Sequence, residues 1–247
     1  MPRGARKKSG SGIYHIMLRG INRQQIFEDE EDRERFLETL ENYKDLCGYK
    51  IYAYCLMGNH IHILLREGRE ELTMVLKRIA GSYVYWYNWK YHRCGHLFQD
   101  RFKSEPVEDD SYFLTVLRYI HQNPVKAKLC KYAEDYPYSS MGEYITFPKL
   151  TETDFALSML PMEQFLDYHR EENEDQCLEI SLDNRITDEE VKALILRLTN
   201  CKNVAEVQLL DRNVRNDCIQ KLHKKGASIR QISRLTGLSK KIVERNV

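Results

Sequence analysis

The residues with the clearest chemical potential lie in the stretch LMGNHIHILL, residues 56–65. Side chains of a β-strand alternate between two faces, so His60 and His62 share one face while Ile61 and Ile63 point to the other. Two neighbouring imidazoles can bind one metal ion. A strand with a His-x-His pair is also compatible with two hydrogen-bonded surface histidines, so the pair needs support from elsewhere in the chain.

That support comes from the stretch RYIHQNPV, residues 118–125. Tyr119 and Asn123 are four residues apart and share one helix face, and Pro124 predicts that the helix ends at Asn123. A tyrosine hydroxyl beside a metal-binding pair is a candidate nucleophile, although packing is the alternative for any one of 16 tyrosines. His121 lies about 200° around the helix from Tyr119 and is interpreted as structural or as a substrate contact.

The elements that would position these residues follow from hydrophobic periodicity and turn residues. We expect strands over residues 11–20, 49–57, 59–66 and 103–108, and helices over 29–46, 72–91 and 110–122. This order predicts an α+β fold, a ferredoxin-like or RRM-like antiparallel sheet with helices on one face. The other face, which carries the histidine pair, is expected to be open.

Composition sets the class of protein. The 247 residues, 42% hydrophobic and 30% charged, suit one large core with a small appended module. No stretch approaches the roughly 20 apolar residues of a membrane span, and no apolar signal segment follows the basic start MPRGARKKSG. Seven cysteines without a C-x-x-C pattern argue against disulfides and structural zinc. We expect a cytoplasmic protein with reduced cysteines and no membrane partner.

Charge divides the chain into three parts. Residues 1–131 hold 22 Lys+Arg and 17 Asp+Glu, residues 132–210 hold 6 and 17, and residues 211–247 hold 10 and 3. Two basic blocks therefore flank an acidic one, which suits a polyanionic partner such as nucleic acid, the alternative being solvated surfaces. We expect a first domain over 1–147, an acidic helical connector over 148–210, with a packing module as the alternative for its helical part, and a basic module over 211–247.

The basic module has the pattern of a helix-turn-helix. Ile229, Ile232 and Leu235 would form the inner face of one helix, Gly237 permits a tight turn, and Ser239 can cap the next helix. The candidate duplex-DNA contacts are Ser239, Lys240, Lys241 and Arg245. The alternative is a helical packing module. The positive charge of residues 211–247 is what favours DNA binding over that alternative.

Taken in order, the motifs resemble those of the single-tyrosine HUH transposases, in particular the bacterial REP-associated tyrosine transposases. Each motif alone is ordinary, whereas the ordered set is specific. The matching stretches are Pro2-Arg3, Tyr14–Arg23, Ile26-Phe27, Asp32-Arg33, Tyr54–Met57, Asn59–His62, Gly95–Gln99, Arg101-Phe102, Tyr119–His121 and Asn123–Val125.

The resemblance implies a metal-dependent transposase that nicks and rejoins single-stranded hairpin DNA. His60, His62 and Asn123 would hold a divalent metal ion, Mg²⁺ or Mn²⁺, which would stabilise charge on the scissile phosphate. Tyr119 would attack the phosphorus and form a 5′-phosphotyrosine link. The third ligand of better-known insertion-sequence relatives is the longer glutamine, and relatives occur as monomers or homodimers, so the metal, the ligation by Asn123 and the oligomeric state stay open.

Basic residues on or beside the open face are the candidate contacts to the single strand. They are Arg3, Arg6, Lys7, Lys8, Arg19, Arg23, Arg101 and Lys103. Exposed aromatic residues among 83–89 would stack on unpaired bases, while packing accounts for at least half of them. Two other functions remain alternatives: a non-catalytic DNA-binding regulator, and a metal-dependent DNA phosphoesterase that uses water.

Overall fold

The computed structural model describes residues 6–99, 101–171, 173, 175, 177–178, 186, 188–199, 201 and 203–247. The chain forms two compact units, Met1–Glu179 and Ile180–Val247. This division differs from the expected boundaries after residues 147 and 210. Residues 148–170, expected to be part of a connector, belong to the first unit, because Ala156 and Phe165 are fully buried in one of its cores.

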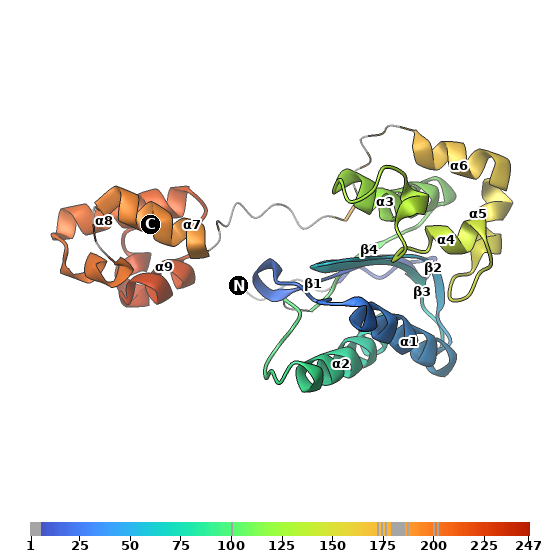
Figure 1. Cartoon of the computed structure of the whole chain (residues 1–247), viewed down its shortest axis with the longest axis horizontal. Helices are drawn as coiled ribbons and strands as arrows, with labels where there is room; N and C mark the ends of the chain where they lie inside the picture. The colour runs from blue at the N-terminus through green and yellow to red at the C-terminus, as the bar shows by residue number, and fades with distance from the viewer. Residues whose placement is uncertain are drawn as a thin grey trace. The chain divides into compact units, whose positions relative to one another are not determined.

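A four-stranded antiparallel sheet organises the first unit (Figure 1). Its strands are β1 (Ile13–Arg19), β2 (Lys50–Met57), β3 (His60–Arg66) and β4 (Lys103–Pro106), in the spatial order β2-β3-β1-β4. β1 pairs with both β3 and β4. This order is that of the split βαβ arrangement, and it confirms the ferredoxin-like α+β fold class.

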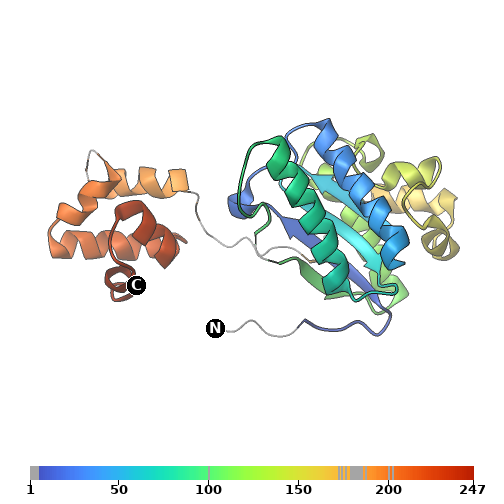
Figure 2. The same ribbon diagram turned by 90° about the horizontal axis from the view of Figure 1, so that it is seen from below.

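Two helices, α1 (Glu30–Cys47) and α2 (Leu72–Lys90), cover one face of the sheet and lie side by side across it (Figure 2). Asp29 caps α1 through a capping box with Asp32. The core beneath them consists of apolar side chains from both layers, including Ile16, Ile61, Ile63, Phe36 and Tyr83. Apolar alternation on β1 and β3 therefore fixes which face these helices cover.

The opposite face, expected to be open, carries a second helical layer. α3 (Asp110–Lys126) lies over it (Figure 1), with α4 (Met141–Ile145), α5 (Thr153–Met159) and α6 (Met162–Arg170) beside it. Ala53 and Leu64 of the sheet share a core with Phe113 and Leu117 of α3. The expectation of an open face was wrong because β2 is apolar on both of its sides, as strands buried on both faces are.

The outer edge of β2 is covered by the segment that carries α4. Backbone bonds run from Leu56 N to Tyr138 O at 2.9 Å and from Ser140 N to Tyr54 O at 2.9 Å. A register irregularity between Ile51 and Ala53 interrupts the β2–β3 ladder there. The amide of Glu152 donates to Ile51 O at 2.7 Å. This edge strand therefore has protein partners on both sides.

The second unit is helical. It contains α7 (Asp188–Thr199), α8 (Arg212–Lys224), α9 (Ile229–Thr236) and α10 (Lys240–Glu244), and the 3-10 turn η3 (Val204–Leu209). The 3-10 turns η1 (Ile21–Arg23) and η2 (Ala133–Asp135) lie in the first unit. Ser228 caps α9 in a capping box with Gln231. Gly237 adopts φ 72°, the left-handed conformation that lets α9 end tightly before α10. Among the helices that the structure describes, none is long and apolar enough to cross a membrane.

Candidate active site

The histidine pair lies on β3, on the face of the sheet that α3 covers. The ring centroids of His60 and His62 are 5.1 Å apart, with the ring planes nearly perpendicular at 86°. Tyr119 of α3 lies over the sheet, its ring centroid 5.7 Å from that of His62. The structure thus brings together the predicted nucleophile and the predicted ligand pair, and Tyr119 is 3% exposed.

A third histidine, His15 of β1, completes this cluster and was missed in the sequence analysis. Its Nε2 lies 2.9 Å from Nδ1 of His62, and its ring centroid is 5.8 Å from that of Tyr119. His15 is fully buried. The signal was present in the sequence, since the period of two that sends Tyr14, Ile16 and Leu18 to one core sends His15 to the other face.

The hydrogen bonds behind the histidine pair bear on which ring nitrogen faces the site. The Nδ1 of His60 is 2.6 Å from Oδ1 of Asn59, an acceptor, so Nδ1 donates and the lone pair of the ring is on Nε2. His62 reaches the same tautomer when its Nδ1 donates to Nε2 of His15. Among the residues that the structure describes, Nδ1 of His15 has no hydrogen-bond partner, so a group bound at Nε2 of His62 would decide the tautomer of His62.

Burial keeps the rings of His15 and His62 neutral. It lowers the pKa of His15 to about 3. Burial, with His15 and His60 nearby, also places the pKa of His62 well below its ordinary value. Neutral imidazoles carry the lone pairs that metal ions require. The donor chemistry of the pair therefore fits a divalent metal ion at neutral pH.

Asn123 lies one helical turn after Tyr119, but the helix does not end there as predicted. α3 runs on to Lys126 with Pro124 inside it. Proline removes one helical hydrogen bond, and the nearby Nδ2 of Asn123 donates to Tyr119 O at 3.1 Å, which stabilises the preceding turn. This bond uses the amide nitrogen, so the Oδ1 atom would be the metal-binding oxygen.

The described residues contain no group of three or more His, Cys, Asp or Glu side chains that could hold a metal ion. The predicted ligand set, His60, His62 and the amide oxygen of Asn123, contains only two side chains of these types. Such an incomplete set is typical of a catalytic site that leaves positions for substrate or water.

His121 has a structural place. It is fully buried, with Nδ1 3.0 Å from Nε2 of His169 and Nε2 2.8 Å from Oγ of Ser140. The His169 Nδ1 in turn lies 2.8 Å from Phe165 O. Of the two earlier interpretations of His121, this network favours the structural one.

The basic residues of the first unit that are predicted to contact single-stranded DNA fall into three groups. Arg19 pairs with His60 across β1 and β3, and Lys103 pairs with Met17, so both lie on the histidine face. Arg6 donates to Phe102 O at 3.0 Å, while Lys8 lies 3.5 Å from Glu71. Lys7, Arg23 and Arg101 are exposed, and Arg3 lies outside the described residues.

The remaining predicted contacts are on the surface. In the second unit Ser239, Lys240, Lys241 and Arg245 are all exposed. On α2, Tyr85 and Trp89 are 80% and 71% exposed, whereas Tyr83 and Tyr87 are buried. The aromatic cluster of this helix therefore divides between packing and surface, as predicted.

Comparisons with known proteins bear on this site. Residues 8–123 match the family described as "Transposase IS200 like". A search of curated proteins found no match. The solved structure titled "Structure of the REP associates tyrosine transposase bound to a REP hairpin" is 17% identical, with TM-score 0.51, and the match covers 73% of this chain and all of that one.

A second solved structure, of a Deinococcus radiodurans R1 protein provisionally described as a transposase, is 17% identical with TM-score 0.34, covering 55% of this chain and 96% of that one. The first solved structure shares the fold, and the family match spans His15, His60, His62, Tyr119 and Asn123. The family match therefore places residues 8–123 among the IS200-like transposases.

Proposed function

We propose that this transposase nicks and rejoins single-stranded hairpin DNA, with Tyr119 as the nucleophile and a divalent metal ion, Mg²⁺ or Mn²⁺, as cofactor. The observation that supports the proposal is the cluster of Tyr119 with two histidine rings, whose centroids lie 5.7 and 5.8 Å from that of the tyrosine. A buried tyrosine beside these imidazoles, within a transposase family match, supports the assignment of Tyr119 as a nucleophile next to metal donors.

His60, His62 and Asn123 would hold the metal ion, through Nε2 of each ring and Oδ1 of the amide. When bound, a divalent cation supplies a positive charge that polarises a phosphate oxygen. The protein's own contribution is orientation: Asn59 and His15 fix the two rings from behind, at 2.6 and 2.9 Å. Second partners of this kind determine ring angle and tautomer.

In the proposed reaction the Tyr119 oxygen forms a bond to the scissile phosphorus as the bond from phosphorus to the 3′-oxygen breaks. The tyrosine hydroxyl loses its proton, and the departing oxygen gains one to become a 3′-hydroxyl. A 5′-phosphotyrosine link remains. Because one phosphodiester replaces another, a 3′-hydroxyl can reverse the step and join strands without a nucleotide cofactor.

DNA would be held by both units. The REP-associated relative was solved with a hairpin, and here Arg19 and Lys103 lie on the histidine face. The helix-turn-helix of the second unit, with exposed Lys240, Lys241 and Arg245, suits duplex DNA. Hairpin DNA has both a single-stranded and a duplex part, so one substrate could engage both.

The test is a covalent-adduct assay with a single-stranded hairpin library labelled 3′ of the cut, in Mg²⁺ or Mn²⁺. We expect label that stays on the protein after boiling in SDS, and its loss in Tyr119→Phe. Tyr112→Phe is the matched control, because it removes one hydroxyl from the same helix and should keep the adduct. EDTA should abolish the adduct.

Other outcomes identify the alternatives. Cutting without an adduct, unchanged in Tyr119→Phe, would indicate a phosphoesterase that uses water. Binding without cutting in either metal would indicate a DNA-binding regulator. An adduct that persists in Tyr119→Phe would assign the nucleophile to another residue.

A further inference from the structure

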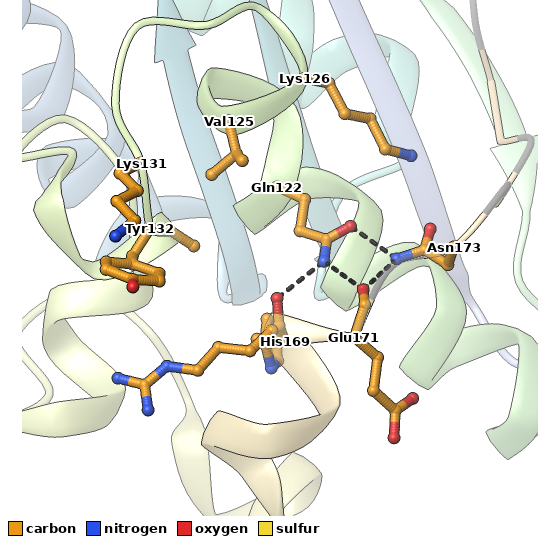
Figure 3. A pocket seen from close by; sticks show the side chains of 10 residues that line it. Gln122, Val125, Lys126, Lys131, Tyr132, His169, Glu171 and Asn173 are labelled. Carbon is orange, nitrogen blue, oxygen red and sulfur yellow. Dashed lines mark hydrogen bonds between the residues drawn. The ribbon is translucent and has the colours of Figure 1, made fainter.

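A pocket of about 450 Å³ opens beside the C-terminal half of α3 (Figure 3). It lies on the same helix as Tyr119 but is not formed by the histidine cluster. The lining residues that matter for its chemistry are Gln122, Val125, Lys126, Lys131, Tyr132 and Arg170. Its size is in the range of sites for small molecules or single nucleotides.

One wall of the pocket is aromatic and cationic. The Tyr132 ring is 41% exposed, with Lys131 Nζ 4.8 Å and the Arg170 guanidinium carbon 5.5 Å from its centroid. Arg170 is also held by Glu134, 2.5 Å away. Both cations lie over the ring, so the ring offers a base a stacking surface when a cation moves aside, next to phosphate-binding charge.

The opposite wall is preformed by amide hydrogen bonds. Nε2 of Gln122 donates to His169 O at 2.7 Å, and Nδ2 of Asn173 donates to Gln122 Oε1 at 2.7 Å, bonds drawn in Figure 3. Val125 adds an apolar surface. The nearby carboxylate of Glu171 lies 3.3 Å from Arg118, which offsets its charge.

The pocket is linked to the nucleophile by one side chain. Lys126 lines it, and Lys126 Nζ lies 4.9 Å from the ring centroid of Tyr119. Gln122 and Val125 are also on α3, within two helical turns of Tyr119. A strand whose phosphate reaches Tyr119 would therefore have its next nucleotide within reach of this pocket.

We propose that the pocket receives one base of the single-stranded DNA next to the scissile phosphate. The base stacks on Tyr132, and the flanking phosphates contact Lys126 and Lys131. Stacking on an aromatic ring tolerates any base, because every base has a π-face. The proposal rests on the proposed function for its substrate, and its test does not depend on cleavage.

The test compares binding of fluorescein-labelled oligothymidine with that of an abasic strand of equal length, by fluorescence anisotropy. Loss of stacking weakens single-strand binding by roughly 5- to 100-fold per base. We expect Tyr132→Leu to weaken oligothymidine binding within that range and to leave abasic-strand binding unchanged, whereas Tyr132→Phe keeps both. Tyr85→Leu is the matched control, since Tyr85 is 80% exposed on α2.

A second variant tests the phosphate contact. Lys131→Ala should weaken binding of both strands alike. It should also reduce the slope of log affinity against log salt by the amount expected for about one lost phosphate contact. Equal oligothymidine affinities of Tyr132→Leu and the intact protein would overturn the proposal. So would a Tyr132-dependent affinity for free thymidine monophosphate without any for oligothymidine, which would indicate a free-nucleotide site.

The adduct assay separates this proposal from the proposed function. If the Tyr119 adduct forms but Tyr132→Leu does not change DNA affinity, the base-pocket proposal is wrong and the proposed function stands. If binding of single-stranded DNA depends on Tyr132 but no adduct forms, the base-pocket proposal stands and the proposed nicking reaction is wrong. Failure of the intact protein to bind oligothymidine would overturn the base pocket, while the adduct assay alone decides the nicking chemistry.

Discussion

The two units differ most plainly in their aromatic content. All 16 tyrosines, 8 phenylalanines and 2 tryptophans precede residue 169, so the second unit has none. Its core consists of aliphatic side chains with one cysteine, including Val191, Ile195, Ile219, Leu222 and Ile232. Without rings it cannot stack on bases, whereas residues 211–247 carry a net charge of +7. The second unit is therefore suited to phosphates and the first to unpaired bases.

The units differ also in what they bury. The first unit buries His15, His62, His121 and His169, while the single histidine of the second, His223, is exposed. Buried imidazoles destabilise the folded state when they must be protonated. The first unit therefore buries titratable rings both at the candidate active site, as His15 and His62, and in the structural network of His121 and His169.

The largest effect should come from Phe165→Ala. Phe165 is fully buried, stacked on Tyr144 at 4.7 Å between ring centroids. Truncation of a buried phenylalanine costs about 3–5 kcal/mol. Urea unfolding followed by tryptophan fluorescence measures it, because Trp86 and Trp89 report on the first unit alone. Phe147→Ala, at an 86% exposed position, is the control and should change little. A small effect of Phe165→Ala would make residues 148–170 a loosely attached connector after all.

Acid should destabilise the first unit next. Burial lowers the pKa of His169 to about 4 and that of His15 to about 3. Below about pH 6.5 the unfolded chain binds protons that the folded chain does not, so stability falls as pH falls. The loss at pH 5 is about 2 kcal/mol for each group. Urea midpoints at pH 7 and 5, with EDTA present, would measure it, and equal midpoints would contradict the burial of neutral rings.

Only part of the fold and of the candidate site could be predicted from the sequence. The shared strand face of His60 and His62 and the shared helix face of Tyr119 and Asn123 followed from periodicity, because alternation and helix pitch are local properties. The burial of Phe165 did not, since α5 and α6 are only 7 and 9 residues long, and the apolar side of so short a helix does not reveal which surface it packs on. The pairing of His15 with His62 depends on strand register, which no local pattern reveals. The helix end predicted from Pro124 was wrong because the packing of α3 on the sheet outweighed the local preference of the residue before proline.

A smaller effect is expected at His15, which would position His62. His15→Leu removes the partner of His62 Nδ1 and should lower Mn²⁺ affinity about 10- to 100-fold. His15→Gln offers an acceptor oxygen and should restore part of the affinity. Isothermal titration calorimetry of the full chain with Mn²⁺ measures both. Equal affinities of the two variants would assign His15 a packing role alone.

The smallest effect belongs to the second unit. Lys241→Ala should weaken duplex binding alike for unrelated sequences and lower the slope of log affinity against log salt by about one. Ser239→Ala, one of the predicted contacts without charge, should leave that slope unchanged. Affinity measured over a salt series checks both, and a change in sequence preference would instead place Lys241 at a base edge.

The covered edge of β2 has a consequence for self-association. Exposed sheet edges are where strands of a second chain add, in dimers and in aggregates alike. In the first unit the Leu56 amide and the carbonyls of Tyr54 and Ile51 are already bonded to residues 138–152. A second copy could therefore not extend the sheet at β2, and a dimer joined through its sheets would have to form along the four residues of β4.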